Sequence, residues 1–446
     1  MVSHEQMSVR PAEAVDRRWP GYMLGFGVAM LLVSARLTTP VLLSLLAVWA
    51  FLARDRLTLA RPQLNAVTAS LSVLLGYALL SSLWAASSLQ GLAEGAMAAG
   101  ITLTTFVLLR LTGQEHRQSL IRLGWAISIG LAVGLTYFLA EELSGQAIKI
   151  WLYNTLRISD DFMEPDQYHR WVHGKLAWIS SSTMSRNVAP ITPLLWPALM
   201  TMLGSLPGHR GRLAAATIFA LSVLVIFLSP HETSKVAIVA ASAILVLASW
   251  RTNWAYRLVT GAWIFACMCI IPAALLAHNL ELQNAPWLQR SAQHRIAIWN
   301  FTAKQVIKAP IFGSGIYTTY VRGPEISAAE EAKPGDRFKA GMSRHAHNVF
   351  LQTWFEFGLV GACLLLAVGL SMIAAMRNLS QRLQPFALAA FTSSMALMSS
   401  SYGMWQDWFL ALFALTAVLF AIGARILDTA PEDYGGLSRS GPAQTA

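Results

Sequence analysis

Residues 349–376 read VFLQTWFEFGLVGACLLLAVGLSMIAAM, and Glu356 is the one charged residue in this stretch. A helix needs about 20 consecutive, mostly apolar residues to cross a bilayer, so this stretch is long enough to span one. Similar apolar stretches lie at 21–35, 38–53, 64–84, 89–110, 121–142, 187–206, 212–229, 234–250, 256–277, 385–402 and 404–425. The sequence therefore predicts an all-α polytopic integral membrane protein, a bundle of about twelve transmembrane helices.

The composition of the 446-residue chain supports this fold class. Hydrophobic residues make up 55% and charged residues 13%, whereas a soluble domain carries about 25% charged residues. The net charge of +10 comes from arginines in short loops, not from a basic stripe, which argues against a nucleic-acid partner. The three cysteines (Cys267, Cys269 and Cys363) lie in apolar stretches, where no disulfide or metal-ligand spacing is present and inert thiols are expected.

The basic residues predict an orientation, because cytoplasmic loops carry an excess of lysine and arginine. One set of loops and the N-terminal segment hold Arg17, Arg18, Arg54, Arg56, Arg61, Arg110, Arg117, Arg122, Arg210, Arg212, Arg251, Arg257, Arg377 and Arg382. The opposite short loops hold almost none, so both termini are predicted in the cytoplasm. The first apolar stretch is expected to be a retained span, because residues 1–20 show no cleavable signal pattern.

The predicted spans divide the chain into four parts. Residues 1–277 form helices 1–9, with an outer segment at about 142–185, and residues 278–348 form a large outer loop domain. Residues 349–429 form helices 10–12, and residues 430–446 form a disordered cytoplasmic tail. The segment 142–185 mixes charges with tryptophan and tyrosine, which suits an interfacial or re-entrant element.

The loop domain carries its own signals. A helix is expected at 286–308, followed by a break at Pro310, a glycine turn at 313–315 and a charged, hairpin-like stretch at 325–339. Loops of this length are usually functional. The glycine turn alone is weak support for phosphate binding, because the strand–turn–helix context of nucleotide loops is missing.

Cationic residues at the outer membrane face are the main functional candidates. Arg186 either extends to lipid headgroups or holds phosphate oxygens in a bidentate grip. Lys235 either pairs with Glu232 or lines an anionic site. Arg295 is either a solvated cation on an amphipathic helix or points at a lipid phosphate, and Arg290 is a weaker candidate.

His347 lies where the outer loop re-enters the membrane, and a histidine there suits a general base because its ordinary pKa lies near 6.5. An interfacial histidine without a catalytic role is the alternative. A metal site with His345 needs further ligands, which the spacing does not offer. No conspicuous charged residue lies in the middle of a span, which argues against a proton-coupled transporter.

These motifs together, in order from Met184 to Gly361, resemble the O-antigen ligase and Wzy polymerase superfamily. They are Arg186-Asn187, then Arg295 with Trp299, then Pro310-Ile311-Phe312-Gly313-Ser314-Gly315, and finally His347-Asn348 with Glu356, Gly358 and Gly361. The Ser234-Lys235 pair departs from the serine–arginine of many relatives; it keeps the charge but loses the bidentate geometry.

The resemblance implies a type-C glycosyltransferase fold in the bacterial inner membrane, with a large periplasmic loop between spans 9 and 10. It implies a glycan donor on undecaprenyl diphosphate, an acceptor hydroxyl on the lipid A core, surrounding membrane lipids, and neither a metal nor another cofactor. Arg186 and Arg295 would bind the diphosphate, with Lys235 or Arg290 helping, and His347 would deprotonate the acceptor for transfer with inversion. Asn187, Trp299, Asn348 and Glu356 complete the motifs.

Three alternatives stay open. A Wzy-type O-antigen polymerase and a protein O-oligosaccharyltransferase share these motifs and differ in the acceptor. A lipid or glycan transporter predicts broken helices with polar groups near the midplane of both halves of the chain. Here the polar groups gather on the outer side, mainly in the second half, which argues against a transporter. The resemblance implies instead a transferase in lipopolysaccharide biosynthesis.

Overall fold

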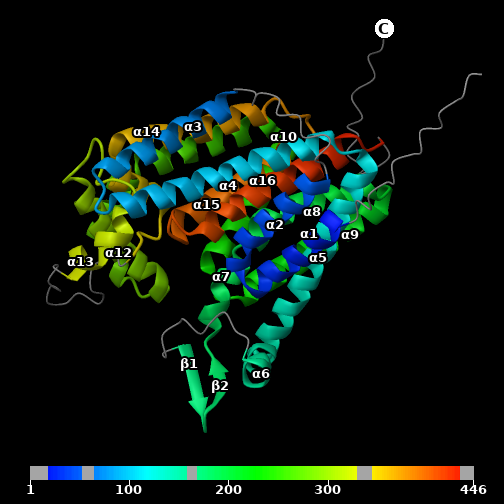
Figure 1. Ribbon diagram of the computed structural model, residues 1–446, viewed down its shortest axis with the longest axis horizontal. Coiled ribbons are helices and arrows are strands. Elements are labelled where there is room, and N and C mark those ends of the chain that lie inside the picture. The colour runs from blue at the N-terminus through cyan, green and yellow to red at the C-terminus, as the bar shows by residue number, and fades with distance from the viewer. Residues whose placement is uncertain (1–18, 53–64, 158–167, 329–343, 432–446) are drawn as a thin grey trace, which may run out of the picture.

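The computed structural model describes residues 19–52, 65–157, 168–328 and 344–431, which fold into a helical bundle (Figure 1). Its first half contains α1 (Trp19–Val33), α2 (Thr38–Leu52), α3 (Ala66–Leu80), α4 (Ser88–Gln114), α5 (Arg117–Ser144), α6 (Ala147–Leu156), α7 (Ser185–Val188) and α8 (Ile191–Ser205). Its second half contains α9 (Gly208–Leu228), α10 (Glu232–Met268), α11 (Ile270–Asn279), α12 (Arg290–Val306), α13 (Thr318–Ala328), α14 (Val349–Met376), α15 (Gln384–Ser400) and α16 (Asp407–Asp428). All twelve predicted apolar stretches overlap helices.

Eight helical segments in the described part of the chain are long and apolar enough to cross a membrane, or nine if the bent pair that ends in α8 is one span. The prediction of a polytopic helical membrane protein is therefore confirmed. The predicted number of twelve spans is not confirmed by length and composition. Two shorter apolar helices, Pro20–Val33 and Ile270–Asn279, fall below the length needed for a span.

Small residues allow the closest helix packing, where α1 lies along α5. At their crossing Gly130 lies so near the backbone of Gly25 that an added Cβ atom would overlap its carbonyl oxygen. Leu24 and Leu31 of α1 and Leu131 of α5 are fully buried beside this crossing. Close backbone approach through small residues is a common way for membrane helices to associate, because lipid removes the hydrophobic driving force between helices.

Helix α10 folds back on itself at Arg251, whose backbone is not helical (φ −134°, ψ 67°). Near the start of α10, the Thr233 hydroxyl donates to the carbonyl oxygen of Ser400. The neighbouring carbonyl oxygen of Ser399, also at the end of α15, accepts from the Asn348 side chain. Near the end of α10, the carbonyl oxygen of Cys267 accepts from Trp354, six residues beyond Asn348. Both ends of α10 therefore lie at the same end of the bundle, and its halves correspond to the two stretches predicted at 234–250 and 256–277.

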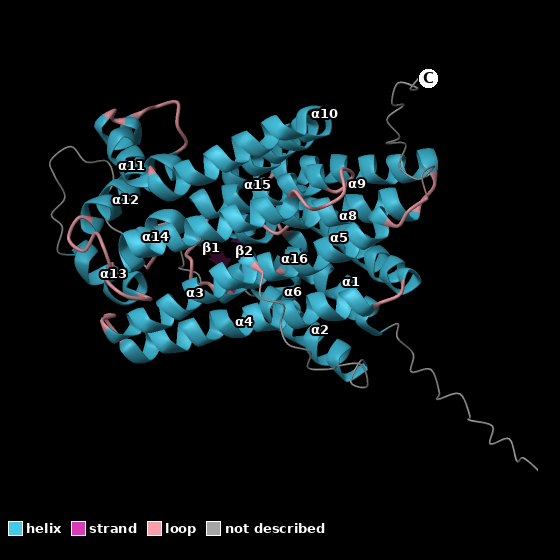
Figure 2. Ribbon diagram, turned by 90° about the horizontal axis from the view of Figure 1, so that it is seen from above, coloured by secondary structure: helices cyan, strands magenta, loops and turns pink. Residues whose placement is uncertain are grey.

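The predicted outer segment at 142–185 contains a β-hairpin that the sequence analysis missed. After α6, strand β1 (His169–Val172) pairs antiparallel with β2 (Lys175–Ile179) (Figure 1). They form the single sheet of the described residues, which otherwise consist of helices, loops and turns (Figure 2). His173 and Gly174 connect the strands, both with positive φ, as a tight hairpin turn requires. The Asn154 side chain ties α6 to the hairpin, since it donates to and accepts from the backbone of Leu176.

Two arginines of the loops predicted in the cytoplasm make structural contacts. Arg117 donates to the carbonyl oxygen of Gly204 at 3.0 Å and to the Thr429 hydroxyl at 3.1 Å, and Arg377 lies over the Tyr256 ring. The predicted orientation of the chain stays a prediction.

Several predicted features lie outside the described residues. They are Arg17 and Arg18, Arg54, Arg56 and Arg61, the part of the charged stretch at 329–339, and the tail from 432 onward. For the same reason the span predicted at 38–53 is described only as far as Leu52, and the segment 142–185 is described without residues 158–167.

The α1–α5 crossing predicts a difference between two helical glycines. Gly130→Ala places a methyl group against the Gly25 backbone, and overpacking of this kind costs about 1–3 kcal/mol. Gly100→Ala in α4 is the matched control, because no atom lies within 4 Å of its added Cβ. Thermal unfolding in detergent should show a lower Tm for Gly130→Ala and an unchanged or higher Tm for Gly100→Ala. Equal Tm values would contradict the tight crossing.

Candidate active site

The glycine turn and the start of α14 form one interlocked unit. Gly358 interrupts α14 with a positive φ of 62°, so the predicted span at 349–376 is two helices rather than one. Backbone groups of the turn replace the lost helical bonds, because Ser314 and Gly315 donate to the carbonyls of Phe355 and Glu356 at 3.0 and 2.8 Å. In return Leu359 donates to the carbonyl of Pro310 at 2.8 Å.

Glycine is required on both sides of this contact. A Cβ atom at Gly313 would overlap the backbone of Glu356, and one at Gly358 would overlap the carbonyl oxygen of Ile311. The motif Pro310-x-x-Gly313-x-Gly315 is therefore a packing device that closes the break in α14. This structural role accounts for the glycines without phosphate binding.

The Glu356 carboxylate holds the unit together from inside. It is fully buried and accepts four hydrogen bonds from three segments of the chain. The donors are the backbone amides of Tyr317 at 2.9 Å and Thr319 at 3.3 Å, the Gln352 amide at 3.0 Å, and the Trp405 indole at 2.6 Å. A buried carboxylate is tolerated only when its oxygens are satisfied in this way. Glu356 is thus a positioning residue.

His347 lies directly in front of α14, which begins with Asn348. The Asn348 side chain accepts from the Leu351 amide at 2.9 Å as an N-cap and donates to the carbonyl of Ser399 at 2.8 Å. His347 Nδ1 lies 2.8 Å from the carbonyl oxygen of Ser401, which can only accept, so Nδ1 carries the proton. The neutral ring therefore presents Nε2 as its basic nitrogen. His347 also has a positive φ of 53°, which is costly for a side-chain-bearing residue and is typical of functional sites.

The His347 ring is held in its neutral form. Burial lowers its pKa to about 3, with contributions from His345, Arg295 and His294, against an opposing contribution from the Ser401 carbonyl. The His345 ring lies edge-on to it, with ring centroids 4.1 Å apart. The pKa of His345 is lowered to about 4, by burial first and then by the charges of Arg186 and Arg295.

Arg186, Arg295 and His347, predicted from separate motifs, converge at this place. The charges of both arginines lower the pKa of His345, and Arg295 also lowers that of His347. Arg186 belongs to the short helix α7 and Arg295 to α12, and both side chains are half-buried. Two guanidinium groups beside a neutral imidazole form a site that suits an anionic group next to a base.

Of the other predicted residues, Lys235 and Asn187 make contacts within the fold and Arg290 is exposed to solvent. Lys235 Nζ lies 2.7 Å from Glu232 Oε1, so the ion-pair reading holds. Arg290 is exposed at the start of α12. The Asn187 side chain accepts from the Ala35 amide at 3.0 Å and donates to the carbonyl of Val33 at 2.6 Å, joining α7 to the end of α1.

Trp299, one turn after Arg295, packs with Phe301, Leu351 and Trp354. This apolar cluster fixes α12 against the first part of α14, and with it the position of Arg295 relative to His347.

The sequence analysis missed two residues of the site, Tyr402 and His231. The Tyr402 hydroxyl donates to the carbonyl of Ser185 at 3.1 Å and lies within the electrostatic field of Arg186 and Arg295. The His231 ring stacks on Tyr402, with centroids 5.8 Å apart, and burial lowers its pKa to about 3. A polar break between two apolar stretches, Ser401-Tyr402-Gly403, was the available signal.

A family comparison covers much of this site. Residues 217–366 match the family model described as O-Antigen ligase, and they include Arg295, His347, Glu356 and the glycine turn. This stretch, the ligase-family stretch, is therefore similar to the O-antigen ligase family. Arg186, in α7, and Tyr402, in the connection between α15 and α16, lie outside the ligase-family stretch.

Two rickettsial relatives, each named "Putative polysaccharide ligase", are also similar. The protein of Rickettsia felis is 24% identical over 237 residues, which cover 51% of this chain and 55% of the relative. The protein of Rickettsia bellii is 26% identical over 159 residues, which cover 35% of this chain and 37% of the relative. The chain therefore spans about half the length, or less, of the relatives it matches.

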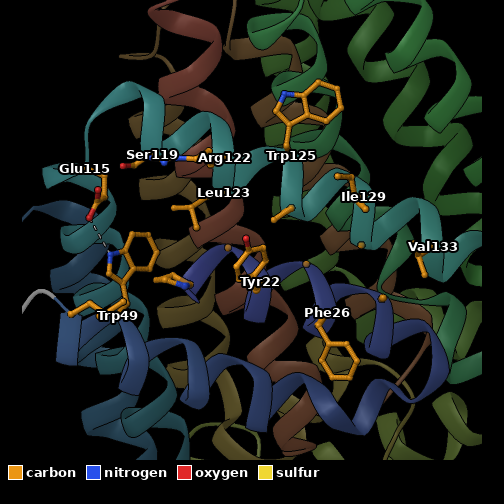
Figure 3. A pocket seen from close by; sticks show the side chains of 17 residues that line it. Tyr22, Phe26, Trp49, Glu115, Ser119, Arg122, Leu123, Trp125, Ile129 and Val133 are labelled. Carbon is orange, nitrogen blue, oxygen red and sulfur yellow. Dashed lines mark hydrogen bonds between the residues drawn. The ribbon is translucent and has the colours of Figure 1, made fainter. Parts of the chain in front are cut away.

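A large cavity lies elsewhere. It measures about 660 Å³ and is lined by α1, α2 and α5, with Tyr22, Phe26, Trp49 and Arg122 on its walls (Figure 3). Tyr22 and Phe26 face outward with 62% and 70% of their surface exposed, so this groove opens on the lipid-facing side of the bundle. None of the predicted site residues lines it. Size therefore does not locate the site, and the converging polar groups do.

The hydrogen bonds of Glu356 predict an effect of an almost isosteric change. Glu356→Gln turns one acceptor into an NH₂ group that faces N–H donors, which costs about 2–3 kcal/mol. Glu325→Gln is the matched control, because this exposed carboxylate makes one loose ion pair, at 3.6 Å, with Arg322. The Tm in detergent should fall for Glu356→Gln and stay within error for Glu325→Gln. A silent Glu356→Gln would show that the carboxylate does not hold the turn.

Proposed function

We propose that the protein is an O-antigen ligase of the bacterial inner membrane, acting at the periplasmic face in lipopolysaccharide biosynthesis. It transfers a glycan from undecaprenyl diphosphate to a sugar hydroxyl of the lipid A core, with inversion and without a metal or another cofactor. The observation that carries the proposal is the convergence of Arg186 and Arg295 beside a neutral His347. The ligase-family stretch around Arg295 and His347 supports it.

The residues suit one chemical step. His347 Nε2 takes the proton of the acceptor hydroxyl while the oxygen attacks the anomeric carbon from the side opposite the diphosphate. The bond between that carbon and the diphosphate oxygen breaks, and its electron pair leaves with the lipid diphosphate. Arg186 and Arg295 stabilise the charge that develops there, through paired hydrogen bonds from planar guanidinium groups. The Ser401 carbonyl fixes the tautomer of His347 and stabilises the imidazolium that forms.

A reconstituted assay tests the proposal. Purified protein in lipid would receive the lipid-diphosphate-linked glycan, with lipid A core in one sample and none in the other, and with chelator in both. Glycan on lipid A core is the expected product. Lengthened glycan without core would identify the polymerase instead. No product in either sample would return the protein-acceptor and transporter alternatives.

Two variants tie the product to the site. His347→Ala should lose about 10²- to 10⁴-fold in rate, the usual contribution of a general base. His209→Ala is the control, an exposed histidine at the start of α9. Arg295→Lys should lose about tenfold or more, because a lysine keeps the charge without the paired bonds. Near-normal transfer by His347→Ala would sink the assignment of the base.

The lowered pKa of His347 predicts the pH dependence. A base acts in its neutral form, and a folded-state pKa of about 3 keeps His347 neutral down to roughly pH 4. We therefore expect kcat/KM to hold between about pH 8 and 5, where a histidine of ordinary pKa would lose most of its neutral form. Bound diphosphate offsets the charge of Arg295 and raises the pKa of His347. As the pH is lowered, kcat should therefore begin to fall at a higher pH than kcat/KM does. Coincident profiles that both fall near pH 6.5 would contradict this electrostatic account.

A further inference from the structure

A second cavity opens beside His345, and neither Arg186 nor Arg295 lines it. It measures about 340 Å³ and is lined by Tyr317, Tyr320, Arg344, His345, Gln352, Gly403, Trp405 and Gln406. These residues come from the residues around the start of α13, the segment before α14, α14 itself and the connection between α15 and α16. The volume is within the range of about 300–1,000 Å³ typical of small-molecule sites.

The aromatic rings of this cavity are fixed in place. Tyr317 and Tyr320 stack with centroids 4.7 Å apart and planes at 18°. The Tyr317 hydroxyl hydrogen bonds to Glu94, and the Trp405 indole donates to Glu356. Held aromatic faces next to polar groups suit a ring with one apolar face and an edge of hydroxyls, and a pyranose sugar has that shape.

The polar side chains of the cavity can also form hydrogen bonds with the hydroxyl groups of a sugar. Arg344 Nη1 donates to the Tyr320 hydroxyl at 2.8 Å, which uses one of five donors and sets the planar guanidinium over the ring. His345 Nδ1 and Gln406 Oε1 are closed off from solvent and have no hydrogen-bond partner among the described residues. Unpaired polar atoms in the wall of a cavity are costly unless a ligand or water satisfies them.

The position of the cavity relative to His347 indicates which sugar it would bind, that of the donor or that of the acceptor. His345 lines the cavity and its ring touches that of His347, with centroids 4.1 Å apart. The donor sugar is attached to the diphosphate and therefore stays with Arg186 and Arg295. The ring whose hydroxyl loses a proton has to lie within hydrogen-bond reach of the base.

We propose that this cavity binds the acceptor sugar ring, packed against the Tyr317–Tyr320 pair and Trp405 and held by hydrogen bonds from Arg344. The proposal rests on the proposed function for the word acceptor, but sugar binding itself does not.

Tyr320→Ala removes the exposed ring of the stack, and Tyr320→Phe keeps the ring but loses the hydrogen bond from Arg344. Tyr320→Ala should raise the KM for the acceptor about tenfold or more and leave the KM for the donor within about twofold. Tyr320→Phe should have a smaller effect. Tyr22→Ala, on the other cavity, is the control and should change neither value. Arg344→Ala, a second exposed position, repeats the test if Tyr320→Ala fails to fold.

Direct binding separates this proposal from the proposed function. The probes are the oligosaccharide released from lipid A core and the repeat-unit oligosaccharide, each titrated without donor into protein in lipid nanodiscs. Binding that Tyr320→Ala weakens supports the sugar site even if no transfer to core is found. A higher donor KM in Tyr320→Ala, or unchanged values for both substrates, would overturn it. Transfer to core with unchanged oligosaccharide binding by Tyr320→Ala would overturn the inference and leave the proposed function standing.

Discussion

One buried carboxylate sets the geometry on which the rest of the site depends. Glu356 accepts hydrogen bonds from the residues before α13, from its own helix and from the α15–α16 connection. No water is available inside a bundle to satisfy either the carboxylate or these donors, so each needs the other. The break at Gly358, which lets the start of α14 turn aside from the rest of the helix, is stable because the glycine turn and Glu356 replace the missing bonds. His347 sits at the head of that displaced segment.

A second constraint is electrostatic. Two half-buried arginines and three histidines share a small volume, which is tolerable because the histidines are neutral. Charging any of them beside Arg295 would place like charges together in a poorly solvated space. Under the proposed function, the positive charge is reserved for the guanidinium groups, which would bind the anionic donor, and the imidazole of His347 stays available to take a proton. The field that weakens the base would then be compensated by the charge of the bound donor.

The helices were predictable because lipid leaves little freedom. A stretch such as 349–376 has to be helical, and all twelve such stretches overlap helices. The break at Arg251 was predicted as the boundary between the stretches 234–250 and 256–277. The break at Gly358 was not predictable from periodicity, because it depends on the distant glycine turn that replaces the lost backbone bonds. The hairpin at His173-Gly174 was missed because its strands are short and lack clean alternation of apolar and polar residues. Arg186, Arg295 and His347 were found through their motifs, whereas Tyr402 and Trp405 matter only because the α15–α16 connection folds back onto α7 and α14.

The side chains of the candidate site and of the second cavity come from different segments of the chain, which affects how the protein can change by substitution. Arg186 and Arg295 are carried by α7 and α12, whereas Tyr320 belongs to α13 and Arg344 to the segment before α14. Among the described residues, the donors to Glu356 are Tyr317, Thr319, Gln352 and Trp405, and neither Tyr320 nor Arg344 is one of them. Substitutions at Tyr320 and Arg344 therefore remove none of the hydrogen bonds that hold the Glu356 unit. Under the proposed function, such a division would let descendants of one ancestor keep a common lipid-borne donor while diverging in the acceptor to which they attach its glycan.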